Sequence, residues 1–193
     1  MLRRLIDLGG RARLRWLAFW LLAGGVLVAD QLTKRWVDAS FGLAWTRGPI
    51  PGLDPPTPIL DDLVRIAKTY NDGGLFGLFG TSAPILALAS LIVIGLILAY
   101  EARVGAPGSW LLTVTLGLLL GGALGNLADR IRLGHVIDWV DTGLGSTRWY
   151  TFNVADAAVS LAIVGLVLVA LLGDRSVDGA PARDSSAAGP ASR

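Results

Sequence analysis

Aspartates are the residues of this chain that could carry acid–base chemistry. Fourteen of the fifteen acidic residues are Asp, and Glu101 is the single glutamate. The chain has no cysteine, and His135 is its only histidine. This composition excludes thiolate nucleophiles, Cys-ligated zinc, iron–sulfur clusters and multi-histidine metal centres. We therefore expect the chemistry to depend on aspartates, with no metal and no cofactor.

The polar residues that could do chemistry are gathered in four clusters, each beside a long apolar stretch. The clusters are Asp30-Gln31-Leu32-Thr33-Lys34, Asn71-Asp72-Gly73-Gly74-Leu75-Phe76-Gly77, Gly121 to Arg130, and His135 to Asp141 followed by Phe152 to Asp156. An ionisable side chain at the edge of a membrane helix is costly, and it is a functional candidate for that reason. Each cluster also has a plain structural interpretation, as an ion pair, a turn, a packing surface or a helix cap.

The first and third clusters have helical spacing. Asp30 and Lys34 are four residues apart and are expected to pair on one helix face. Gly117, Gly121, Gly125 and Asp129 form one stripe of the third cluster, and Gly122, Asn126 and Arg130 form the next. Glycines at this spacing let another helix pack closely. The amide, carboxylate and guanidinium above them predict a scaffold that holds other polar groups in place.

A pair of aspartates could hydrolyse an amide bond. Two carboxyl groups a few ångströms apart cannot both ionise readily, so such a pair holds one proton. The ionised partner can take a proton from a water that attacks the carbonyl, and the protonated partner can polarise the carbonyl and protonate the departing nitrogen. The residues alone do not decide which two of Asp129, Asp138, Asp141 and Asp156 would form the pair. Asn153 is suited to cap a helix with Asp156 at its third position, which is a purely structural alternative for Asp156.

Four apolar stretches predict the helices that position these residues. Each is long enough, or nearly so, to cross about 30 Å of hydrocarbon. We expect helices at about 16–37, 82–100, 109–128 and 154–172, within a membrane domain of 16–172. The composition agrees, because 53% of the residues are hydrophobic and only 17% are charged. The outer loop at 38–81 is rich in proline, and its segment from Leu63 to Tyr70 partly alternates apolar and polar residues, which suggests a strand.

The predicted fold class is therefore an all-α membrane protein with four transmembrane helices and a small extracytoplasmic β cradle. Arginines in the basic segment 1–15 favour a cytoplasmic N-terminus, so both termini would be cytoplasmic. The loops at 38–81 and 129–153 would then lie outside, and all four polar clusters would meet at the outer face. The composition of 173–193 predicts a disordered cytoplasmic tail. The net charge of +2 gives no reason to expect nucleic acid.

Five sequence boxes, taken in order, resemble those of lipoprotein signal peptidase (signal peptidase II). The boxes are Asp30 to Lys34, Asn71 to Gly77, Gly121 to Arg130, Val136 to Asp138 and Phe152 to Asp156. One box alone is weak, but five in order over residues 30 to 156 are very specific. Two departures are Gly74 and Leu75, which stand where the family usually has alanines.

The resemblance implies an aspartic endopeptidase of the bacterial cytoplasmic membrane, with Asp138 and Asp156 as its catalytic dyad. The implied supporting and substrate-binding residues are Asp30, Lys34, Asn71, Gly74, Gly122, Asn126, Asp129, Arg130 and Asn153. The implied substrate is a prolipoprotein that carries diacylglyceryl on cysteine and is cut just before that cysteine. Membrane lipid is the other expected partner, and a monomer is expected.

Three other classes of membrane protein fit part of this pattern. A small transporter or channel also uses intramembrane Asp and Arg, but its polar groups tend to lie near the midplane. A scaffold would use the aspartates only to cap and pair, and active Asn variants of Asp138 and Asp156 would favour it. A lipid-phosphate hydrolase usually needs more Arg, Lys and His around the phosphate than this outer face offers.

Overall fold

The computed structural model describes residues 10–73, 83–104 and 109–174 of the chain. These residues form four long helices: α2 (Gly10–Ser40), α3 (Ala83–Val104), α4 (Trp110–Leu133) and α5 (Val154–Asp174). All four are long and apolar enough to cross a membrane. Large apolar side chains such as Leu88, Leu161 and Val167 stay exposed along them, as expected for surfaces that face lipid.

Helix α4 is the centre of the bundle and packs against α2, α3 and α5. Its glycines make the close approach possible. A Cβ at Gly121 would lie 2.6 Å from the Ala23 carbonyl oxygen on α2, and a Cβ at Gly122 would lie 2.6 Å from the Ala155 carbonyl oxygen on α5. The glycine stripes predicted from the sequence therefore face two different helices.

Capping residues set the ends of α4 and α5. Ser109 accepts a hydrogen bond from the Leu112 amide at the start of α4, and Gly134, with φ of 78°, ends that helix. At the start of α5, Asn153 Oδ1 accepts from the Asp156 amide at 2.9 Å, and Asp156 Oδ2 accepts from the Asn153 amide at 3.2 Å. This reciprocal pair is the capping box that the sequence predicted.

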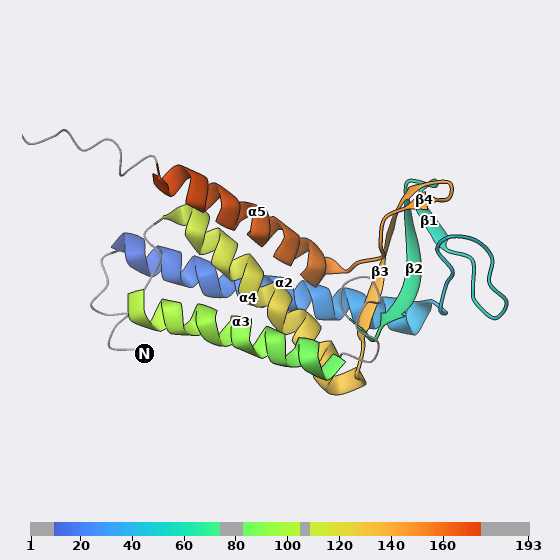
Figure 1. Ribbon diagram of the computed structural model, residues 1–193, viewed down its shortest axis with the longest axis horizontal. Coiled ribbons are helices and arrows are strands. Elements are labelled where there is room, and N and C mark those ends of the chain that lie inside the picture. The colour runs from blue at the N-terminus through green and yellow to red at the C-terminus, as the bar shows by residue number, and fades with distance from the viewer. Residues whose placement is uncertain (1–9, 74–82, 105–108, 175–193) are drawn as a thin grey trace, which may run out of the picture.

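A four-stranded antiparallel sheet lies at one end of the bundle, as Figure 1 shows. Its strands are β1 (Thr57–Leu60), β2 (Val64–Asn71), β3 (Val136–Leu144) and β4 (Thr147–Arg148), paired in that order. The register between β2 and β3 shifts at a β-bulge. Ile66 lies opposite Val140, whereas Thr69 lies opposite Asp138. Such a bulge bends a strand and redirects the side chains beside it.

The predicted fold class, four transmembrane helices with a small β cradle, is confirmed. The helices extend beyond the predicted ranges, most of all α2, which starts at Gly10 and continues to Ser40. The expectation that 129–153 is a loop is wrong, because α4 continues to Leu133 and the segment then forms β3 and β4. Residues 1–9, 74–82 and 175–193 lie outside the described residues, and with them most of the predicted tail.

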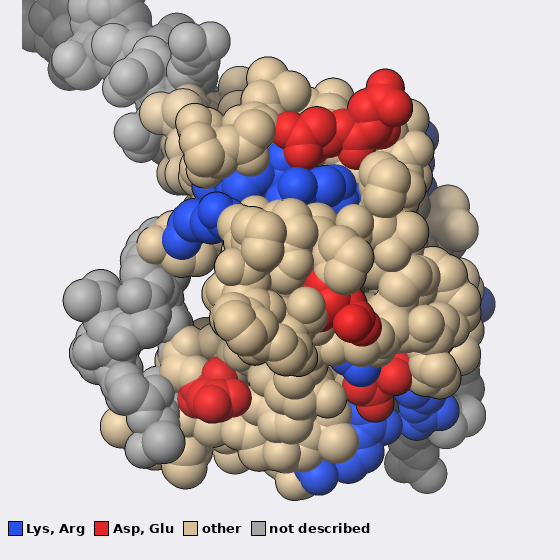
Figure 2. Space-filling view, turned by 90° about the vertical axis from the view of Figure 1, so that its right-hand side faces the viewer, with Lys and Arg blue, Asp and Glu red and all other residues tan. Residues whose placement is uncertain are grey.

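The start of α2 and the end of α5 lie at the end of the bundle opposite the sheet (Figure 1). The sheet end carries both acidic and basic side chains on its surface (Figure 2). Exposed charged residues of the sheet and its connecting segments are Arg47, Asp54, Asp61 and Asp72.

Candidate active site

A fully buried ion cluster joins α2 to α4 beneath the sheet. Lys34 Nζ lies 2.8 Å from Asp30 Oδ2 and 2.9 Å from Asp129 Oδ2, and all three side chains have no exposed surface. The predicted pairing of Asp30 with Lys34 is therefore present. Asp30 Oδ1 also accepts a hydrogen bond from the Ala155 amide at 3.0 Å, so the cluster holds the first turn of α5.

Asp141 belongs to a second ion cluster, within the sheet. Its Oδ2 accepts from Arg65 NH2 at 2.6 Å, and its Oδ1 accepts from Arg148 Nε at 3.0 Å. Both arginines also bind Asp62, which lies in the turn between β1 and β2. This cluster ties β2, β3 and β4 together, and it gives Asp141 a structural role.

Asp138 and Asp156 are held differently, because their carboxylates accept hydrogen bonds from amides. Asp138 accepts from Asn153 Nδ2 at 2.7 Å and from Asn71 Nδ2 at 3.0 Å. Asp156 accepts from Asn126 Nδ2 at 2.7 Å and from the Asn153 amide at 3.2 Å. Within the described parts of the chain, neither carboxylate forms an ion pair with a cation.

Two asparagine side chains connect the two carboxylates. Asn153 Nδ2 donates to Asp138 and, at 3.2 Å, to Asn126 Oδ1, while Asn126 Nδ2 donates to Asp156. Asn153 is fully buried, and Asn126 is 9% exposed. The network therefore brings together residues from β2, β3, α4 and α5 that lie far apart in the sequence.

The environment of Asp138 favours its protonated form. Its side chain is only 3% exposed, although as an isolated loop residue it would be a solvated carboxylate. Burial and the neighbouring charge of Asp156 raise the pKa of Asp138 to about 7, against the opposing effect of the hydrogen bonds from Asn71 and Asn153. Asp156 is half-buried at the amino end of α5, where backbone N–H groups stabilise a negative charge.

Arg130 lies close to this network but forms no ion pair with Asp138 or Asp156 among the described residues. Its NH1 donates to the Asn126 carbonyl oxygen at 3.4 Å, and its Nε is buried without a hydrogen-bond partner among the described residues. Its charge interacts with Asp156, Asp138 and Asp129. The guanidinium thus has unused donors beside the two aspartates.

A groove of about 760 Å³ runs past Arg130 between the first turns of α3 and the end of α4. Both polar and apolar residues line it. The lining residues are Asp72, Ala83, Pro84, Ala87, Arg130, Ile131, Leu133, Gly134 and His135. The His135 ring packs on Tyr70, with the ring centroids 4.1 Å apart, next to Asn71.

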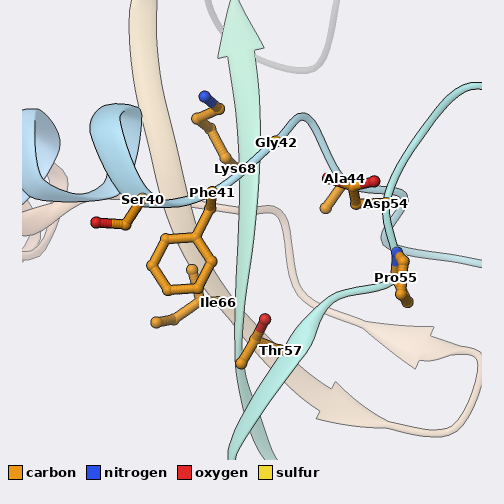
Figure 3. Close-up of a pocket in the computed structure, with 9 residues that line it drawn as sticks. All are labelled: Ser40, Phe41, Gly42, Ala44, Asp54, Pro55, Thr57, Ile66 and Lys68. Atoms are coloured by element: carbon orange, nitrogen blue, oxygen red, sulfur yellow. The ribbon is translucent and has the colours of Figure 1, made fainter.

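A smaller cavity of about 250 Å³ lies between β2 and the segment that follows α2 (Figure 3). None of the residues that line it is among the predicted site residues. Lys68, which borders this cavity, donates to the Asp38 backbone and carboxylate at 3.2 and 3.3 Å.

Almost all of the predicted site residues lie in or beside one network. Gly122 contributes by letting α5 pack closely on α4. The other described site residues take part in the hydrogen bonds, ion pairs and charge interactions given above. Gly74 lies outside the described residues, as does Leu75. Sequence reasoning missed Gln31, whose Nε2 donates to Asp129 Oδ1 at 2.9 Å, and the arginine partners of Asp141. Gln31 was visible in the first polar cluster, whereas no local pattern marks the arginines.

The chain is similar to known proteins over most of its length. The family model described as Signal peptidase (SPase) II matches residues 22–172. A lipoprotein signal peptidase of Syntrophus aciditrophicus is 37% identical over 156 residues, which are 78% of this chain and 89% of that protein. A lipoprotein signal peptidase of Thermosynechococcus vestitus is 39% identical over 155 residues, 77% of this chain and 88% of that protein.

A solved structure is also similar. A bacterial membrane enzyme determined by the in meso method at 2.3 Å resolution aligns with a TM-score of 0.65 at 25% identity. The alignment covers 81% of this chain and 88% of the solved chain.

Proposed function

Because this chain belongs to the signal peptidase II family, as its motifs predicted, we propose that Asp138 and Asp156 are its catalytic aspartates. The protein is a membrane peptidase that removes signal peptides from lipoprotein precursors. One observation carries the choice of residues. Asp129 and Asp141 are neutralised by Lys34 and by arginines, whereas Asp138 and Asp156 accept hydrogen bonds from amides alone in the described structure.

In this mechanism the two carboxyl groups share one proton, and the difference in their burial decides which of them carries it. Asp138 is the more deeply buried, so it holds the proton, which leaves Asp156, at the amino end of α5, as the base. Asp156 takes a proton from a water as the water oxygen attacks the scissile carbonyl. Asp138 donates a hydrogen bond to the carbonyl oxygen and then gives its proton to the departing nitrogen as the C–N bond breaks. A proton transfer from Asp156 to Asp138 restores the starting state.

The substrate in this proposal is a prolipoprotein whose cysteine carries diacylglyceryl, cut at the bond before that cysteine. The lipid anchor would hold this bond near the membrane surface, where the two aspartates lie beyond the apolar turns of α4 and α5. The groove beside Arg130 opens next to the network and has the mixed polar and apolar lining that a lipidated peptide needs.

In the same proposal the sheet end faces outward and both termini are cytoplasmic. Arg11, Arg13 and Arg15 lie at the opposite end of the bundle, as the positive-inside rule requires of the cytoplasmic side. The protein would act as a monomer in contact with membrane lipid.

The test is hydrolysis of a purified diacylglyceryl-modified precursor, with the new N-terminus mapped by mass spectrometry. Asp138→Asn and Asp156→Asn should fold and lose turnover by at least about a thousandfold, since each removes a proton-transfer group. Asp61→Asn, which changes an exposed carboxylate in the turn between β1 and β2, is the matched control and should keep full activity. Fully active variants of the pair would favour a scaffold with structural aspartates instead.

A further inference from the structure

Lys34 touches the catalytic network through one atom. Its Nζ donates to Asn126 Oδ1 at 2.9 Å, in addition to its ion pairs with Asp30 and Asp129. An ammonium group has three N–H donors and no acceptor, so all three donors of Lys34 are used. The side chain is fully buried, and water does not compete for these contacts.

This contact decides which way the Asn126 amide points. Because an ammonium can only donate, the atom of Asn126 that faces Lys34 has to be the oxygen. The nitrogen then faces Asp156, to which it donates at 2.7 Å. In the flipped orientation the NH₂ group would oppose the ammonium, and the oxygen would oppose the carboxylate.

We infer that Lys34 is a positioning residue that fixes the orientation of the Asn126 amide and thereby keeps an N–H donor directed at the carboxylate of Asp156, the proposed general base. This inference rests on the proposed catalytic roles of Asp138 and Asp156. A hydrogen bond donated to a carboxylate stabilises its charged form, whereas an opposing carbonyl oxygen favours the protonated form. The ammonium on α2 therefore acts on a carboxylate of α5 that it does not touch.

Several other groups act on Asp156 and have to stay constant in a test. Asp138 acts from β3 and Arg130 from α4, and the Asn153 amide at the amino end of α5 donates a hydrogen bond to Asp156. Asn153 Nδ2 also donates to Asn126 Oδ1, at 3.2 Å, but it is shared with Asp138. Among the described residues, Lys34 is the only cation that contacts the Asn126 side chain.

The variant Lys34→Met/Asp129→Asn removes one positive and one negative charge, so the net charge of the buried cluster is unchanged. On the acid side (the acid limb) of its pH profile, the pH at which kcat/KM falls to half should rise by about one unit. The free energy of one hydrogen bond to a charged group corresponds to a shift of about that size. At pH values below this limb, activity should then be about tenfold lower than in the native protein, with KM constant. The charge of Lys34 also acts on Asp138, so the comparison is made on the acid limb alone. A purely structural loss would lower activity equally at every pH.

Lys68→Met is the matched control, since Lys68 is also buried but pairs with Asp38 at the sheet. Its acid limb should stay at the position of the native protein. If the first variant does not fold, Lys34→Met/Asp30→Asn provides a second charge-balanced test with the same expected shift.

The inference is overturned if a folded, charge-balanced Lys34 variant keeps the acid limb of the native protein. That result is separate from failure of the proposed function. If Asp138→Asn or Asp156→Asn retains turnover, the catalytic assignment itself fails. If both are inactive and the limb does not move, only the role of Lys34 is wrong.

Discussion

Replacing Gly122 by alanine tests whether the packing of α4 on α5 sets the catalytic geometry. A Cβ at this position would lie 2.6 Å from the Ala155 carbonyl oxygen and 2.7 Å from Val159 Cγ2. Ordinary contact begins at about 3.4 Å, so the first turn of α5 must move by about 0.8 Å. Asp156 is in that turn, and it would move away from Asp138, which is on β3.

A displacement of this size should lower kcat/KM by about 10- to 100-fold, since misplacing a catalytic group by about 1 Å has that effect. Overpacking should also lower the unfolding free energy by about 1–3 kcal/mol. The assay is cleavage of a fluorescent diacylglyceryl-modified precursor in detergent, with thermal unfolding measured on the same samples.

Gly24→Ala on α2 is the control, because a Cβ there meets nothing within 4 Å. It should keep full activity and equal or slightly higher stability, since alanine favours helix. A folded Gly122→Ala protein with the kcat/KM of the native protein would refute the reasoning, because the two helices would then tolerate separation without loss of geometry.

Three further predictions concern the chemistry of the site. Arg130→Lys should lower kcat/KM by about tenfold with little change in melting temperature, because an ammonium cannot replace the planar fork of donors beside the aspartates; equal turnover would remove Arg130 from the site. Turnover should fall as the pH rises through about 7, because Asp138, whose pKa is raised to about 7 by burial, must carry a proton to act; a rate still rising at pH 9 would contradict this. Chelators should leave hydrolysis unchanged, and metal-dependent turnover would overturn the two-aspartate mechanism.

The helices and the fold class were predictable because long apolar stretches have few alternatives in a membrane. The residues at which the helices begin and end were less predictable. Helix α2 runs from Gly10 to Ser40 and exceeds its predicted range of about 16–37 at both ends. Asp30 and Lys34 stay within it because they pair with each other and with Asp129 of α4. Strand β3 was missed because its burial pattern does not alternate as that of a half-buried strand would.

The catalytic pair could not be chosen from the residues alone, because the partners that distinguish the aspartates are distant in the sequence. Asp141 is paired with Arg65, 76 residues away. Asp129 is paired with Lys34, on another helix. Only the family resemblance pointed to Asp138 and Asp156, whereas the predicted capping box at Asn153 needed only local spacing and is present.

The capping box at the start of α5 means that, in the proposed mechanism, one carboxylate both caps a helix and acts as a base. Asp156 Oδ2 satisfies the otherwise free amide of Asn153, so an Asp156→Ala protein would lose a helix-terminal hydrogen bond together with its base. If the alanine variant were inactive, unwinding of the first turn of α5 could not be separated from loss of the catalytic carboxylate. Asparagine keeps an oxygen acceptor at the same place, and in the proposed mechanism protonation of Asp156 would weaken the hold on that turn as well.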